Sequence, residues 1–146
     1  MSATLHTILN QQLANWSILH VKFHNFHWFV KGHQFFTLHA KFEELYTEAA
    51  LHVDNLAERL LALGGKPMAT MRGYLDAASV RDAVGGESAE QMVATTVNDF
   101  QLMIDELKVG MNAAAASNDE TTEDLLQEIH ASVEKHVWML NAFLGK

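Results

Sequence analysis

Residues 24–60 read HNFHWFVKGHQFFTLHAKFEELYTEAALHVDNLAERL, and the fold class follows from this stretch. After Gly32, apolar residues recur at alternating spacings of three and four, which is the period of an amphipathic α-helix. This stripe consists of Leu38, Phe42, Leu45, Ala49, Val53, Leu56, Leu60 and Leu63. Gly32 separates it from a similar stripe upstream, and Gly64, Gly65 and Pro67 end it, as glycine and proline beyond a helix do. The stretch therefore predicts a helical hairpin.

Three further stripes of the same period lie in residues 8–30, 93–111 and 126–144, and no segment alternates in the manner of a strand. Ser88 with Gln91 and Ser117 with Glu120 resemble capping boxes that open the last two helices. Residues 66–86 form a long crossover, in which Met71–Ala78 is predicted to be a short helix. Two helices, a long crossover and two more helices predict an all-α, ferritin-like four-helix bundle that forms a single domain over residues 1–146.

The composition excludes several classes of protein. The chain has 146 residues, no cysteine, one proline and a formal net charge of −8. It has neither a long apolar run nor a basic and apolar N-terminal segment, so we expect no membrane span, no secretion signal and a cytoplasmic location. The lack of cysteine excludes disulfides and thiolate chemistry. The negative charge argues against binding to DNA or to a membrane surface.

The second predicted helix carries four possible metal ligands on one side. If His39 is placed at zero and each residue advances by about 100°, then Glu43 falls near 40°, Asp54 near 60° and Glu58 near 100°. His39 with Glu43, and Asp54 with Glu58, form two pairs with i,i+4 spacing, in which side chains converge. The two pairs are roughly 16 Å apart along the helix axis, whereas metal–ligand bonds are only about 2 Å long. One chain therefore cannot close one site with all four residues.

The two pairs meet if two copies of this helix lie antiparallel across a two-fold axis, which creates two identical sites. His27 and His39 lie symmetrically about the break near His33, so the hairpin brings them to one level. The predicted intersubunit site consists of His27, His39 and Glu43 from one subunit with Asp54 and Glu58 from its neighbour. Such imidazole and carboxylate ligands suit Fe(II), and also Zn or Mn. The alternative is that each histidine is hydrogen-bonded in the core and each acid is a solvated surface group.

At these residues the sequence resembles the Dps family of miniferritins, the DNA-binding proteins from starved cells. The resemblance is carried by HW-x-V-x-G-x-x-FF-x-LH-x-x-FE-x-x-Y, by D-x-x-AER and by EKHVWML-x-AFL, which together run from His27 to Leu144. It implies a hollow shell of twelve subunits that oxidises Fe(II), typically with hydrogen peroxide, stores ferric mineral inside and protects the cell from oxidative damage. It also implies an iron or di-iron site at a dimer interface, with Glu43 as the auxiliary ligand, formed by His27, His39, Glu43, Asp54 and Glu58.

The resemblance implies roles for other residues as well. Trp28 would donate electrons and quench radicals during peroxide turnover, and the alternative is a core or interface aromatic. His33 would bind a second iron, or it is a surface residue at the end of the loop. Acids at the start of the last helix, including Asp119, Asp124 and Glu128, would line iron-entry pores at a three-fold axis. Acids near a helix N-terminus are also favoured by its dipole alone.

The residues also allow other functions. Members of the family that bind DNA commonly use flexible basic tails, but the first lysine or arginine here is Lys22, inside the first predicted helix. We therefore expect no direct DNA binding, and the alternative is a nucleoid-associated protein with secondary ferroxidase activity. A non-catalytic helical interaction module and a larger ferritin shell are the other candidates. The twelve acids against one base in residues 82–134 predict a surface that attracts cations.

Overall fold

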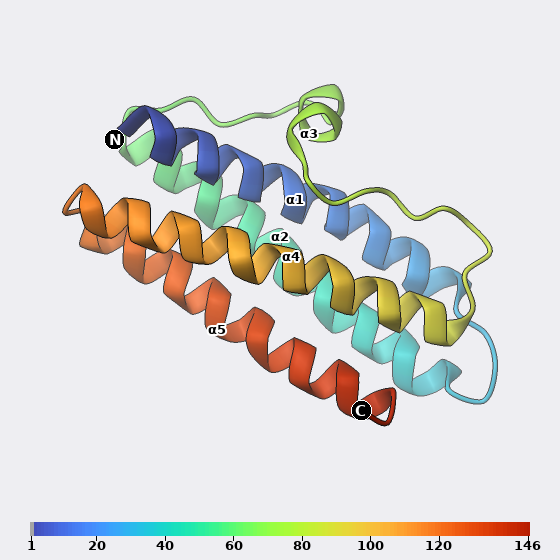
Figure 1. The fold of residues 1–146 in the computed structure, drawn as a ribbon. Coiled ribbons are helices and arrows are strands. Elements are labelled where there is room, and N and C mark those ends of the chain that lie inside the picture. The colour runs from blue at the N-terminus through green and yellow to red at the C-terminus, as the bar shows by residue number, and fades with distance from the viewer. Residues whose placement is uncertain (1) are drawn as a thin grey trace.

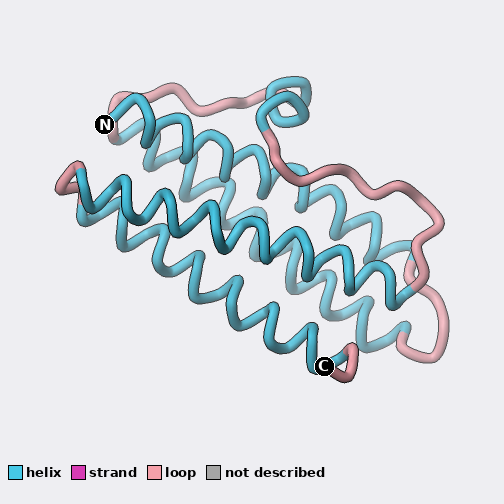
Figure 2. Tube along the Cα trace, viewed as in Figure 1, coloured by secondary structure: helices cyan, strands magenta, loops and turns pink. Residues whose placement is uncertain are grey.

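The computed structural model describes residues 2–146, with side chains described from Leu5 onward. The chain forms α1 (Ser2–Phe29), α2 (Phe35–Ala62), α3 (Met71–Ala77), α4 (Ala89–Ala116) and α5 (Glu120–Phe143). There is no β-strand in these described residues. Figure 1 shows α1–α2 and α4–α5 as two antiparallel hairpins, and Figure 2 shows the long loop that joins them and carries α3. The predicted all-α four-helix bundle with a short helix in its crossover is confirmed.

The crossover between α2 and α4 runs along α1 for the length of the bundle, so that α2 and α4 point in the same direction (Figure 1). Two buried polar residues of α1 hold it in place. Asn15 Oδ1 accepts from the Ser79 backbone N–H at 2.8 Å, and Lys22 Nζ donates to the Arg81 carbonyl at 2.7 Å. Lys22 also pairs with Asp99 of α4 at 2.8 Å. These bonds satisfy backbone groups of an irregular segment and thereby fix the crossover on the bundle.

Most helix boundaries fall where the sequence predicts them. Gly32 (φ +108°) lies in the turn before α2 and Gly64 (φ +80°) follows its end, and glycine adopts this left-handed conformation without steric cost. The Ser88 hydroxyl accepts from the Gln91 N–H, and Gln91 Oε1 accepts from the Ser88 N–H, which completes the predicted capping box of α4. The short helix is one residue shorter than predicted, and Thr70 caps it.

The start of α5 differs from the prediction, because the capping box of Ser117 and Glu120 is wrong. Ser117 ends α4, and its hydroxyl donates back to a carbonyl in the last turn of that helix at 3.0 Å. Asn118 then reverses the chain with φ +56°, and Asp119 is the N-cap of α5, accepting from the Thr122 N–H at 3.0 Å. The predicted cap lies two residues early because the left-handed residue Asn118 turns the chain between the two helices and leaves Asp119 as the N-cap.

The four apolar stripes meet in one core that runs along the bundle. The buried side chains of α2 include Phe42, Leu45 and Leu56, which face this core. None of the described helices is long and apolar enough to cross a membrane. Because the core fixes the rotation of α2 about its axis, the side of α2 that carries the predicted carboxylate ligands faces away from the core.

Candidate metal site

Two histidines meet where α1 ends and α2 begins. His27, in the last turn of α1, is only 7 % exposed, and His39 lies in the second turn of α2. The turn through Gly32 brings α2 back along α1, so that the two imidazole rings stack with centroids 3.7 Å apart and planes 15° apart. The hairpin therefore places two of the predicted ligands side by side.

Each of these histidines is held by the backbone of the other. His27 Nδ1 lies 2.6 Å from the His39 carbonyl oxygen, and His39 Nδ1 lies 2.8 Å from the His27 carbonyl oxygen. A carbonyl oxygen only accepts, so each Nδ1 carries a proton and donates it. In the neutral ring the other nitrogen, Nε2, then keeps its lone pair, and this is the form that ligates a metal. The pair is held in a tautomer and an orientation that suit a metal site.

The three carboxylates of the predicted site lie on the outer side of α2. Glu43, Asp54 and Glu58 are all exposed. Among the described residues, no group of three or more His, Asp or Glu side chains has an arrangement that could hold a metal ion. The single chain therefore brings His27 and His39 together, but it does not add any of the three carboxylates to that pair as a third ligand.

Aromatic rings surround the histidine pair. Tyr46 of α2 meets the His27 ring edge-on, with centroids 5.3 Å apart and planes 85° apart, and it stacks on His24 at 3.7 Å. Phe35 stacks on His39 at 4.9 Å. Tyr46 was not among the predicted site residues, although its spacing of seven from His39 places both on one side of α2 and could have indicated it.

Trp28 lies at the outer end of these rings. Its side chain is 65 % exposed, and its ring contacts His24 with a centroid separation of 5.2 Å. Trp28, His24, Tyr46 and His27 thus form a continuous series of ring contacts, which we call the aromatic series. It connects the surface of the chain with the buried member of the histidine pair.

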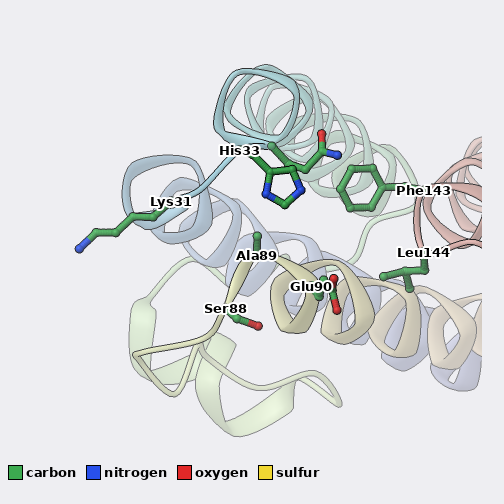
Figure 3. A pocket seen from close by; sticks show the side chains of 8 residues that line it. Lys31, His33, Ser88, Ala89, Glu90, Phe143 and Leu144 are labelled. Atoms are coloured by element: carbon green, nitrogen blue, oxygen red, sulfur yellow. The ribbon is translucent and has the colours of Figure 1, made fainter.

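His33 lies in the turn between α1 and α2, where it is exposed. It lines a surface cavity of about 430 Å³ between this turn, the start of α4 and the end of α5 (Figure 3). The other lining residues are Lys31, Gln34, Ser88, Ala89, Glu90, Phe143 and Leu144. None of the other predicted ligands lines this cavity, so the chain does not join His33 to the histidine pair.

The acids at the start of α5 are not equivalent. Asp119 accepts from both the N–H and the hydroxyl of Thr122 and pairs with Arg59 of α2 at 3.0 Å. Burial alone would raise the pKa of Asp119, but the hydrogen bonds from Thr122 and the charge of Arg59 outweigh it, so the pKa lies below its usual range. Asp124 and Glu128 are exposed. Asp119 therefore joins α2 to α5, a role that the sequence did not reveal.

Replacing Asp119 with alanine is expected to lower the free energy of unfolding by about 1–2 kcal/mol, because the change removes both the cap of α5 and the partner of Arg59. Asp119→Asn keeps a capping oxygen without the charge, so we expect a smaller loss. The pKa of Asp119 is lower in the folded protein than in the unfolded chain. The stabilisation that depends on its charge is therefore present when the pH is above the ordinary aspartate pKa of 3.8, and it is lost as the pH falls below that value. Denaturant unfolding over this pH range measures both effects, and equal stabilities of all three proteins at neutral pH would contradict the prediction.

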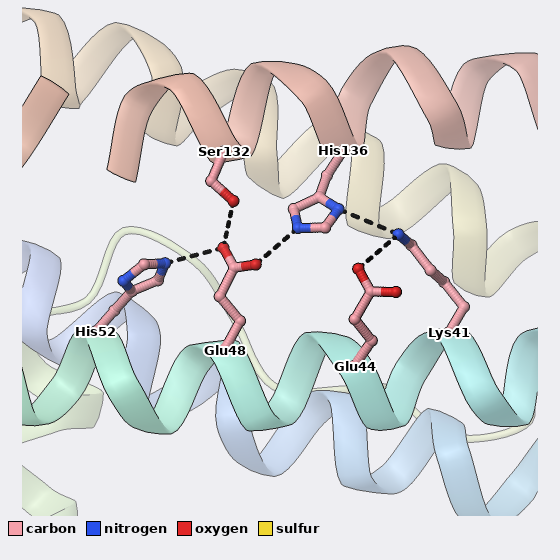
Figure 4. Close-up of polar contacts among 6 residues, drawn as sticks. All are labelled: Lys41, Glu44, Glu48, His52, Ser132 and His136. Atoms are coloured by element: carbon pink, nitrogen blue, oxygen red, sulfur yellow. Dashed lines mark hydrogen bonds and ion pairs between the residues drawn. The ribbon is translucent and has the colours of Figure 1, made fainter. Parts of the chain in front are cut away.

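A second polar cluster joins α2 to α5 (Figure 4). Glu48 Oε1 accepts from His136 Nε2 at 2.9 Å, while Oε2 accepts from His52 Nε2 at 2.9 Å and from Ser132 Oγ at 2.6 Å. Lys41 Nζ donates to His136 Nδ1 at 3.2 Å. Burial alone would raise the pKa of Glu48, but these hydrogen bonds outweigh it and hold the pKa well below its usual range. We call these five residues the Glu48 cluster.

The sequence matches a known protein family over almost its whole length. Residues 7–146 match the family model of the ferritin-like domain. The chain is 56 % identical over 146 residues, or 100 % of both sequences, to the DNA protection during starvation protein 2 of Bacillus anthracis. The chain belongs to the Dps family.

Solved Dps structures have the same fold as this Dps chain. A Dps protein from Bacillus brevis superposes with a TM-score of 0.96 at 56 % sequence identity, covering 97 % of this chain and 95 % of that one. Dps from Listeria innocua, soaked with zinc, superposes with a TM-score of 0.93 at 42 % identity, covering 97 % of each chain. The predicted family and the predicted ferritin-like fold are confirmed.

Proposed function

We propose that this Dps chain oxidises Fe(II) with hydrogen peroxide and stores the ferric product as mineral inside a hollow dodecamer. Membership of the ferritin-like Dps family supports a role in iron storage. The observation that carries the proposal is the histidine pair, in which reciprocal backbone hydrogen bonds leave both Nε2 atoms to bind a metal. We place this activity in the cytoplasm, where it protects the cell from oxidative damage.

The proposed iron site lies between two subunits across a two-fold axis. Its ligands are His27, His39 and the auxiliary Glu43 of one subunit, with the partner subunit's Asp54 and the partner subunit's Glu58. The exposed carboxylates support this arrangement, because a two-fold contact brings the same surfaces together twice and so completes two sites at once. Imidazole and carboxylate ligands suit Fe(II) as substrate, in one or two copies, and they also accept Zn or Mn.

The chemistry is a two-electron reduction of peroxide. Two Fe(II) ions each give one electron, the O–O bond breaks, two protons are taken up, and two water molecules and two Fe(III) ions result. Because both electrons arrive together, no hydroxyl radical is released. The protein positions the ions and offsets their charge with carboxylates. Trp28 would supply single electrons when only one iron reacts, and the chain has no cysteine to be oxidised instead.

Iron would enter the shell through pores lined by Asp119, Asp124 and Glu128 at three-fold axes. A ring of exposed carboxylates attracts cations into a pore. The exposed Asp124 and Glu128 support this role more strongly than Asp119, whose carboxylate is paired with Arg59. His33, exposed beside its own cavity, is proposed as a ligand for a second iron.

Iron-dependent chemistry is the direct test of this proposal. Anaerobic addition of Fe(II) to the purified shell, followed by hydrogen peroxide, is expected to produce ferric absorbance that depends on the protein. Electron microscopy is expected to show electron-dense cores inside the shells. A protein that gave neither result would be a non-catalytic interaction module, and the proposal would be wrong.

DNA binding is the competing function, and the net charge of the chain predicts that a DNA-binding assay will be negative. With a net charge of −8 per subunit and no lysine or arginine before Lys22, the shell is expected to repel phosphate groups. A gel-shift assay at low salt, neutral pH and without divalent metal is therefore expected to leave plasmid DNA unretarded. Retardation under these conditions would favour the nucleoid-associated alternative.

A further inference from the structure

The two turns of α1 that precede His27 carry two further histidines, His20 and His24. They are four residues apart, so their side chains leave the helix on the same side and can converge. Their rings meet edge-on, with centroids 4.7 Å apart and planes 72° apart. Both side chains are only partly buried. The two rings therefore form a second histidine pair that solvent reaches.

Hydrogen bonds to backbone carbonyls fix the position of the proton on both rings. His20 Nδ1 lies 3.1 Å from the Tyr46 carbonyl oxygen of α2, and His24 Nδ1 lies 2.8 Å from the His20 carbonyl oxygen. Since a carbonyl oxygen only accepts, each Nδ1 carries a proton and donates it. In each neutral ring Nε2 then keeps its lone pair, which is the form that ligates a metal.

The separation of the two rings is that of two imidazoles bound to one metal ion. A ring that binds through Nε2 at about 2.1 Å has its centroid about 3.2 Å from the metal. Two such rings at a bond angle of about 90–110° have centroids about 4.5–5.2 Å apart. The observed separation of 4.7 Å lies within this range. The pair can therefore share one ion while the backbone stays where it is.

The surroundings of the pair favour some metals over others. His20 lines a surface cavity of about 230 Å³, whose lining includes Ser17, Met71 and Tyr74 but no aspartate or glutamate. Water in this cavity can complete the coordination of an ion. Hard cations prefer oxygen ligands, whereas imidazole nitrogen suits late transition metals, and for one set of ligands the affinity rises from Fe(II) to Cu(II) and falls again at Zn(II).

We propose that His20 and His24 bind one Cu(II) ion per subunit, and Zn(II) less tightly. Both ligands lie on α1 of one subunit, so this site does not need the two-fold contact that the proposed iron site requires. The inference therefore goes beyond the proposed function. It gives the shell a capacity for late transition metals besides iron.

The test measures the Cu(II) bound to assembled, iron-free shells by equilibrium dialysis, in wild type, His20→Gln and His24→Gln. Glutamine is chosen because its NH₂ group can still donate to the carbonyl that each Nδ1 contacts. Wild type is expected to bind one more Cu(II) per subunit than either variant. In electron paramagnetic resonance, the Cu(II) species that both variants lack is expected to show splitting from two nitrogen ligands.

His6→Gln is the matched control, because His6 lies on the same helix, roughly 21 Å before His20 along the axis. This variant is expected to bind as much Cu(II) as wild type. Equal copper contents in wild type and His20→Gln would overturn the site, and so would a loss in only one variant of the pair. A shell that binds this copper but oxidises no Fe(II) would contradict the proposed function and leave the copper site standing.

Discussion

Shells built only from His27→Ala subunits, or only from Asp54→Ala subunits, are expected to oxidise Fe(II) on the order of 100-fold more slowly than wild-type shells. Shells assembled from an equal mixture of the two variants are expected to recover about a quarter of the wild-type rate. The recovery follows from the two-fold geometry. In a mixed dimer one site collects both alanines, while the other keeps an intact His27 and an intact Asp54. Half of the dimers are mixed and half of their sites are intact. Initial rates of oxidation by peroxide in shells reassembled from dissociated subunits measure this recovery.

A second mixture provides the control. Asp54→Ala subunits combined with Glu58→Ala subunits are expected to recover nothing, because both residues would enter each site from the same subunit. Recovery in this mixture as well would show that mixing raises the oxidation rate for a reason other than the sharing of sites between subunits. Failure of the His27 and Asp54 mixture to recover would mean that the site is not shared between subunits in the proposed way.

The largest effect on stability is expected at Glu48, where Glu48→Gln should lower the free energy of unfolding by about 2–4 kcal/mol. The carboxylate accepts on one oxygen from His136 and on the other from His52 and Ser132. A glutamine offers one oxygen and one NH₂ group, so one imidazole N–H would face another donor. His136 cannot relieve this by changing tautomer, because the Lys41 ammonium already donates to its Nδ1. If the amide oxygen stays with the buried His136 N–H, the NH₂ group faces His52 and Ser132, and the hydrogen-bond donors of these two residues lose this acceptor.

Glu44→Gln is the matched control for this change. Glu44 lies on the same helix, is exposed, and forms an ion pair with Lys41 at 3.2 Å. Its replacement is expected to change the free energy of unfolding by less than about 0.5 kcal/mol. Denaturant unfolding of all three proteins at one subunit concentration keeps the contribution of assembly equal. Equal losses in both variants would show that the Glu48 cluster does not stabilise the contact between α2 and α5.

The Glu48 cluster also predicts a direction of pH dependence. The folded-state pKa of Glu48 lies below its ordinary value of 4.5 because the hydrogen bonds from His136, His52 and Ser132 outweigh burial. A carboxylate whose pKa is lowered by folding contributes its full stabilisation when the pH is above its ordinary pKa. This stabilisation is lost as the pH falls below that value. The difference in stability between wild type and Glu48→Gln is therefore expected to be constant near neutrality and to shrink in acid. A difference that grew in acid would contradict this assignment.

The periodicity of the apolar residues, together with the residues that begin and end helices, was enough to predict the helices, the hairpins and the crossover of this chain. Helix period is a local property, so the spacing of Leu38, Phe42 and Leu45 already indicates which side of α2 is buried. The glycine at position 32 and the capping box at Ser88 act over a few residues and were predicted correctly. The two pairs of possible ligands on α2, His39 with Glu43 and Asp54 with Glu58, were identified in the same way, because their separation along one helix follows from its rise per residue. The error at Ser117 arose where a turn depends on how two helices meet.

The contacts that give the site its chemistry depend on the packing of separate helices, and no local pattern contains them. The free Nε2 atoms of His27 and His39 depend on carbonyl groups 12 residues away in the chain. Arg59, the ion-pair partner of Asp119, is 60 residues away in the chain, and the hydrogen bond from His136 to Glu48 spans 88 residues. Hydrogen bonds form only within a few tenths of an ångström of their ideal length, whereas periodicity specifies only a direction around a helix. The position of one helix along another is set by the packing of the whole core, and it is this position that pairs Tyr46 with His27 and Glu48 with His136.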